Sequence, residues 1–186
     1  MDSIKVIKSK RKTFSLEIKR DGGVVVRVPL FATDGQIRDF VLEHKDWLEK
    51  HLAENERARE EYSSLPLLSA DDIKALKARA KSYIPVRTEY WAKIIGAEYS
   101  SVTVRAQKTR WGSCSSKGNL SFNCLLMLTD TEIIDYVIIH ELCHTKELNH
   151  SKRFWALVGS VMPNYKQVRS RLKGEEGKIF SRMYNN

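Results

Sequence analysis

The first part of the chain changes from a strand pattern to a helix pattern. Residues 4–29 alternate apolar and polar positions around Asp21-Gly22-Gly23, which predicts a β-hairpin. Over residues 35–61, apolar positions recur every three or four residues, which predicts one amphipathic helix. Residues 62–69 break both patterns and predict a linker. We therefore expect an N-terminal domain of hairpin plus helix over residues 1–68.

The remainder of the chain, residues 69–186, mixes helical patterns with short strand-like segments. A helix should begin near Ser69, bend at Pro85 and stop at Gly96. Residues 102–105 and 120–123 have strand composition and are joined by a long polar connection, which indicates a small sheet. These patterns predict an α+β fold for the second domain.

The next predicted helix contains a chemically distinctive motif. Thr129 and Glu132 are spaced as a capping box before an apolar run, which predicts a helix that continues into His140. A C-terminal helical block should follow from Ser151, break at residues 162–165 and end in a short helix over residues 165–173. A polar tail should follow.

The composition is that of an ordinary globular protein, with 42% hydrophobic and 30% charged residues in 186. No apolar run approaches the roughly 18 residues that a membrane span needs, and the N-terminus lacks the apolar core of a signal peptide. We therefore expect a cytoplasmic protein without a membrane partner. Cys114, Cys124 and Cys143 form no C-x-x-C pair and are expected as reduced thiols, with a Cys114–Cys124 disulfide as the alternative.

The net charge of +9 is concentrated at the C-terminal end. Residues 151–186 hold 8 basic and 2 acidic side chains, so nucleic acid is a candidate partner. The segment has no recognisable nucleic-acid-binding motif, which favours an ordinary solvated surface.

The chemistry lies in His140-Glu141-Leu142-Cys143-His144 and in His150, six positions later. A helix advances about 100° per residue, so His140 and His144 share one face and can reach one small cation. Zn²⁺ is the ion that most often takes two or three histidine nitrogens and keeps an open position. We expect one Zn²⁺ per chain, with Glu141 placed to take a proton from a metal-activated water.

Two residues compete for the third ligand position. On a continued helix Glu147 would lie about 20° from His140, on the ligand face. His150 is preferred, because a side chain that arrives from beyond the helix end completes a tetrahedron more easily. With the three histidines as ligands, the site is best suited to hydrolysis of a peptide bond, with a peptide or protein as substrate.

Five blocks of residues accompany the H-E-x-x-H motif: Arg110-Trp111-Gly112-Ser113-Cys114-Ser115, Asn119-Leu120-Ser121-Phe122-Asn123, Asn149-His150-Ser151, Phe154-Trp155 and Met162-Pro163. Together with the motif they resemble the YgjP-like metallopeptidase family, whose core is similar to that of the SprT-like and WLM zinc peptidases. The resemblance implies a zincin-like fold, in which a small mixed sheet packs on the H-E-x-x-H helix. It also implies His140, His144 and His150 as zinc ligands and Glu141 as the catalytic residue, with 119–123 as an edge strand that pairs with an extended peptide.

The same resemblance keeps two alternative functions open. Some members of the family are associated with nucleoside triphosphate pyrophosphatase activity, although this chain has no glycine-rich phosphate loop. The SprT-like and WLM groups suggest a protease that acts on DNA-associated proteins, which would suit the basic C-terminal segment.

Overall fold

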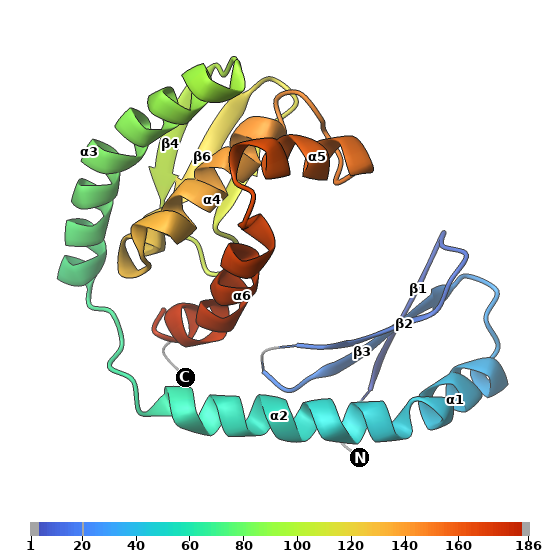
Figure 1. Ribbon diagram of the computed structural model, residues 1–186. Helices are drawn as coiled ribbons and strands as arrows, with labels where there is room; N and C mark the ends of the chain where they lie inside the picture. Colours follow the sequence, from blue (N-terminus) through green and yellow to red (C-terminus); the bar gives the residue numbers. More distant parts are fainter. Residues whose placement is uncertain (1–3, 20, 184–186) are drawn as a thin grey trace. The chain divides into compact units, whose positions relative to one another are not determined.

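A computed structural model describes residues 4–19 and 21–183, so the extreme N-terminus and the end of the predicted polar tail lie outside the described residues. The chain divides into two compact units, residues 1–65 and 66–186, each with its own hydrophobic core. The described residues combine two small sheets with six α-helices, which confirms the α+β fold (Figure 1). The domain assignment, with its boundary at residues 68 and 69, stays a prediction.

The first unit is a three-stranded sheet followed by two helices. Strands β2 and β3 form the predicted hairpin, and β1 adds a parallel strand on the other edge of β3. Apolar side chains of β3 pack against Ile37, Phe40 and Val41 of α1. The elements are β1 (Lys5–Ser9), β2 (Ser15–Ile18), β3 (Val24–Pro29), α1 (Asp34–Glu43) and α2 (Lys45–Ser63).

The prediction of one continuous helix over residues 35–61 was wrong. The chain leaves helical geometry at His44 (φ −103°, ψ 16°), which separates α1 from α2. The His44 Nδ1 lies 2.9 Å from the carbonyl oxygen of Phe40. The apolar spacing continues across this break, so periodicity alone could not locate it.

The second unit surrounds helix α4, which contains the zinc motif. Helices α3, α5 and α6 all contact α4, as do strands β5 and β6 (Figure 1). The three strands form a mixed sheet in the order β4-β6-β5. The elements are α3 (Ala70–Ile95), β4 (Ser101–Arg105), β5 (Gly112–Cys114), β6 (Asn119–Asn123), the 3₁₀ helix η1 (Cys124–Leu128), α4 (Thr131–Cys143), α5 (Lys152–Val161) and α6 (Tyr165–Ser181).

The expectation that residues 119–123 form an edge strand was wrong. Strand β6 lies in the centre of its sheet, parallel to β4 on one side and antiparallel to β5 on the other. Its Leu120 and Phe122 are fully buried, as a strand covered by neighbours requires. Among the described residues, β5 is the strand that contacts α4 and has one unpaired edge. The sequence pattern placed its residues in the long polar connection between the two predicted strands.

Helix α3 begins and ends where the sequence indicated. Ser69 and Asp72 form a reciprocal capping box at its start, and Gly96 ends it in the left-handed conformation (φ 64°). Pro85 lies inside the helix, which curves without breaking (Figure 1).

The start of α4 differs from the capping box predicted at Thr129. Asp130 is the N-cap instead, and its side chain accepts a hydrogen bond from the amide of Ile133. Glu132 accepts hydrogen bonds from Asn164 and Arg171, and Arg171 also pairs with Asp130. The carboxylates at this helix start therefore join α4 to α6 and neutralise part of the basic C-terminal segment.

Helix α6 is longer than the predicted segment of residues 165–173. It continues to Ser181 because Ile179 and Phe180 are buried, and Phe180 packs against Trp111 with ring centroids 4.6 Å apart. The charged and glycine residues between 173 and 178 hid this apolar end from the sequence pattern.

Two expectations about the chain's environment can be compared with the described residues. Cys114, Cys124 and Cys143 are all free thiols, and Cys124 and Cys143 are buried, so the alternative Cys114–Cys124 disulfide is absent. None of the helices in the described ranges has the length and apolar character needed to cross a bilayer. The cytoplasmic location stays a prediction.

A buried ion pair fixes α3 against the helix that contains the motif. Arg87 donates two hydrogen bonds to the carboxylate of Asp135, from Nε at 2.9 Å and from Nη2 at 2.5 Å. The side chain of Asp135 is 9% exposed, whereas that of Arg87 is 28% exposed and also lies over the ring of Tyr90. A bidentate pair of this kind restricts both the distance and the rotation between two helices.

We expect Arg87→Met to lower the free energy of unfolding by about 3 kcal/mol, because it leaves the buried Asp135 carboxylate without a partner. Urea denaturation of the metal-free protein measures this change. Lys93→Met is the matched control, since it removes an exposed pair with Glu89 from the same helix and should have no measurable effect. Equal losses in the two variants would contradict a special role for the Arg87–Asp135 pair.

Candidate metal centre

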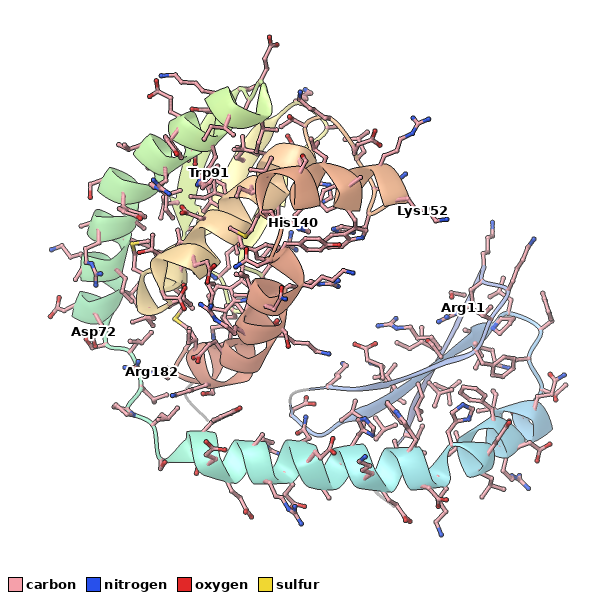
Figure 2. The ribbon with its side chains drawn as sticks, in the orientation of Figure 1. Arg11, Asp72, Trp91, His140, Lys152 and Arg182 are labelled. Atoms are coloured by element: carbon pink, nitrogen blue, oxygen red, sulfur yellow. The ribbon has the colours of Figure 1, made fainter. Side chains whose placement is uncertain are left out.

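Three histidines from two segments of the chain converge beside α4. The ligand nitrogens of His140, His144 and His150 all lie within 4.8 Å of one another, and the Nε2 atoms of His140 and His150 are 3.0 Å apart. Figure 2 shows His140 near the crossing of α4 with α5, whose first residue Lys152 is also labelled. Tetrahedral zinc with nitrogen ligands would separate neighbouring nitrogens by about 3.3 Å, so the donor set fits a small cation.

The end of α4 places two of these side chains. His140 lies in the last turn of the helix, and His144 is its C-cap. The four-residue spacing puts their imidazoles side by side, with centroids 4.9 Å apart. The Nδ1 of His144 lies 3.1 Å from the carbonyl oxygen of Glu147, which suits donation by Nδ1–H and leaves the Nε2 lone pair available to a metal.

The third histidine enters from the start of the next helix. Ser151 is the N-cap of α5 and accepts a hydrogen bond from the amide of Phe154. Asn149 accepts a hydrogen bond from the amide of Ser151, so the residues on both sides of His150 are held in a tight turn. This reversal brings His150 back over the face of α4 that carries His140.

Glu147 is not part of this cluster. The argument for it assumed that α4 continues, but the helix ends at Cys143 and the chain turns away. Its backbone carbonyl, rather than its carboxylate, interacts with the site through His144.

The surroundings of His140 and His150 favour neutral imidazoles. Burial lowers the pKa of His140 to about 3, and the neighbouring His144 and His150 act in the same direction. Burial also lowers the pKa of His150, with further contributions from His144 and Arg169. Neutral imidazole is the form that donates a lone pair to a metal, so the electrostatics of the cluster suit metal binding.

Glu141, the residue that follows His140, is buried, with an exposed fraction of 7%. Burial raises the pKa of Glu141 to about 7, and the positive charge of Arg110 opposes part of this rise. A carboxyl group with a pKa near neutrality can both accept and donate a proton at physiological pH.

Gly112 allows β5 to approach Glu141 closely. A β-carbon at position 112 would lie 2.8 Å from both Cγ and Oε1 of Glu141, so any larger residue would displace that side chain. This contact was missed in the sequence, where Gly112 appears only within Arg110-Trp111-Gly112-Ser113. Residue types alone cannot distinguish a turn from a short strand that contacts the side chain of Glu141.

Asn123 fixes the loop that leads into β5. Its buried side chain donates to the carbonyl oxygens of Gln107 and Arg110 and accepts from the amide of Leu125. Its backbone amide donates to the carbonyl of Trp111. The last residue of the central strand thus holds the segment that positions Gly112 against Glu141.

Comparison with known protein families identifies the class of protein. The family model described as "YgjP-like, metallopeptidase domain" matches residues 12–73 and 69–175. The chain belongs to the YgjP-like metallopeptidase family. This YgjP-like chain therefore has a metallopeptidase domain, and its three-histidine cluster has the donor atoms to hold the metal ion that such a domain implies.

Two solved structures are similar to this YgjP-like protein. One is the metallopeptidase zymogen of Pyrococcus abyssi abylysin, with 26% identity and a TM-score of 0.46, covering 50% of this chain and 93% of that chain. The other is the metallopeptidase zymogen of Methanocaldococcus jannaschii jannalysin, with 19% identity and a TM-score of 0.45, covering 50% of this chain and 95% of that chain. Comparison with curated proteins gives no match.

The raised pKa of Glu141 predicts a pH-dependent cost to stability in the metal-free protein. Between pH 4.5 and about 7 the carboxyl ionises in the unfolded chain but stays protonated in the folded one, so stability falls as the pH rises. Glu141→Gln should therefore become more stable relative to the wild type across this window, by at most about 1.4 kcal/mol per pH unit. Urea denaturation in a chelator from pH 4.5 to 8 measures the difference.

Glu132→Gln provides the opposite case on the same helix. Hydrogen bonds from Asn164 and Arg171 lower the pKa of Glu132, so its contribution is present above pH 4.5 and is lost as the pH falls. Its stability relative to the wild type should therefore be constant from pH 4.5 to 8 and should rise as the pH falls below 4.5, whereas that of Glu141→Gln rises as the pH increases. A stability difference for Glu141→Gln that does not vary with pH would contradict the prediction.

Proposed function

We propose that the protein is a zinc-dependent peptidase in which His140, His144 and His150 hold the metal and Glu141 moves the proton. The observation that supports this most directly is the pairing of a three-histidine cluster with an adjacent buried carboxyl group of near-neutral pKa. Zinc is the metal of choice because a set of neutral imidazoles with an open position is its common catalytic environment.

The substrate should lie along β5. This strand has one edge paired with β6 and one edge open among the described residues, and it contacts both α4 and Glu141. An extended peptide could pair with the open backbone groups of Gly112 to Cys114 by strand addition. This placement replaces residues 119–123, whose backbone groups are used within the sheet.

The metal, when bound, supplies Lewis acidity that polarises a carbonyl group and lowers the pKa of water. Glu141 would accept the proton of the attacking water on a carboxylate oxygen. The same oxygen would then donate that proton to the leaving amine nitrogen. Gly112 keeps the carboxyl group in one position during both transfers, because the backbone of β5 packs directly against it.

The two alternative functions gain no support from the described residues. Arg171, in the basic C-terminal segment, is already paired with Asp130 and Glu132. Arg169 lies over the ring of Trp155, where its charge acts on the histidine cluster. Peptide hydrolysis therefore remains the proposed reaction, with a peptide or protein as substrate.

Glu141→Gln should lower the rate of peptide hydrolysis by roughly 10² to 10⁴-fold, because it removes the proton acceptor. It should bind zinc with unchanged stoichiometry, since the histidine ligands are intact. Peptide cleavage assays together with metal analysis measure both properties. A Glu141→Gln protein that cleaves peptides at the wild-type rate would falsify the proposed mechanism.

Two variants provide the control for the ligand assignment. His150→Ala should lose tightly bound zinc, whereas Glu147→Ala should keep it because its carboxylate lies outside the cluster. The reverse result would assign Glu147 as the third ligand.

Gly112→Ala should lower kcat by about 100-fold, because displacement of a catalytic group by about 1 Å is costly. The zinc affinity should not change, since the added methyl group meets Glu141 and not the histidines. Gly174→Ala is the matched control, because a β-carbon there has no neighbour within 4 Å. Unchanged kcat in Gly112→Ala would show that Glu141 does not need this contact.

A further inference from the structure

His150 differs from the other two histidines in how it is held. It is exposed and lies on the irregular segment between α4 and α5, whereas His140 and His144 lie at the end of a helix. Among the described residues, its one polar neighbour within hydrogen-bonding distance is the Nε2 of His140. That contact joins the two nitrogens that would face the metal, so it cannot orient His150 once a metal is bound.

An aromatic stack takes the place of an orienting hydrogen bond. The ring of Trp155 on α5 lies nearly parallel to the imidazole of His150, with an interplanar angle of 19° and centroids 5.5 Å apart. Phe154 meets the same imidazole edge-on, with centroids 4.9 Å apart and an interplanar angle of 84°. The two rings restrict His150 from two directions.

Trp155 is itself fixed by the start of α6. Its ring stacks on Tyr165 at 5.4 Å and 12°, and the guanidinium carbon of Arg169 lies 4.8 Å from its centroid. Gly159 makes room for this arrangement, because a β-carbon there would lie 3.3 Å from the ring of Tyr165. The stack therefore connects His150 to the packing between α5 and α6.

We propose that Trp155 is a positioning residue that holds His150 in its metal-binding orientation, an inference that rests on the proposed ligand role of His150. A free imidazole on an exposed segment would lose conformational freedom when it binds the metal, and this loss weakens binding. In the folded chain, the stack on Trp155 restricts the imidazole of His150 before any metal binds. A metal-bound imidazole is also electron-poor and interacts favourably with the face of an indole ring.

Phe154 packs against all three imidazoles, but the parallel stack on Trp155 belongs to His150, and the three ligands differ in what else holds them. His144 is fixed by the carbonyl of Glu147, and His140 by its place in the last turn of a buried helix. His150 depends on ring packing. Residues that orient a ligand commonly change metal affinity by about 10 to 100-fold when they are replaced, so the effect is large enough to measure.

The test compares zinc dissociation constants, measured by competition with a chromophoric chelator. Trp155→Leu should bind zinc about 10-fold more weakly than the wild type, and Trp155→Phe, which keeps a ring, should bind within a few-fold of it. Trp155→Leu should have little further effect in a His150→Ala background, because the ligand that it positions is absent. The absorption spectrum of the Co²⁺ form should change in Trp155→Leu as the coordination geometry loosens.

A second histidine–tryptophan stack in the chain gives the matched control. Trp47 stacks on His51 within α2, with centroids 4.3 Å apart and an angle of 23°. Trp47→Leu removes the same kind of stack from residues outside the metal cluster and should leave the zinc affinity unchanged. Thermal unfolding of each metal-free variant shows whether it is folded.

The outcomes separate this inference from the proposed function. If Trp155→Leu binds zinc with wild-type affinity, the positioning role is overturned. If Trp155→Leu weakens zinc binding equally in the wild-type and His150→Ala backgrounds, the effect comes from general packing, and the positioning role is overturned as well. If His150→Ala itself leaves the zinc affinity intact, the ligand assignment fails and this inference fails with it. If His150→Ala weakens binding and Trp155→Leu does not, the ligand assignment stands alone.

Discussion

The burial of the Glu141 carboxyl group is the constraint on which the site depends. A carboxyl group out of water favours its neutral form, and here burial raises its pKa to about 7. That burial requires three features: helix α4 is packed on nearly every side, Gly112 lets β5 approach the carboxyl group, and the side chain of Asn123 holds the loop that leads into β5. The Glu141 carboxyl group and the hydrophobic core are therefore parts of one arrangement.

The sequence predicted the features that depend on local chemistry. Ser69 and Gly96 limit α3 because a cap and a left-handed glycine act within a few residues. His140 and His144 share a helix face for the same reason, and Ser151 starts α5. The correct fold class followed from these elements together with the resemblance of the motif blocks.

Features that depend on long-range packing could not be predicted from local sequence patterns. Strand β5 consists of Gly-Ser-Cys, which has no strand propensity, and it forms because β6 offers an open edge. The last turns of α6 are polar in sequence but fixed by Phe180 against Trp111, 69 residues earlier in the chain. The N-cap of α4 moved by one residue because Glu132 is used by α6. In each case a distant partner outweighed the local signal.

The shortness of β5 has a further consequence. A strand directs the N–H and C=O groups of only every second residue toward a given edge, so a three-residue strand has few to offer an incoming chain. Backbone pairing would therefore hold a polypeptide weakly, and selectivity would have to come from side chains on either side of the bond to be cut. An open edge this short is also a poor template for strand-to-strand association between copies of the protein.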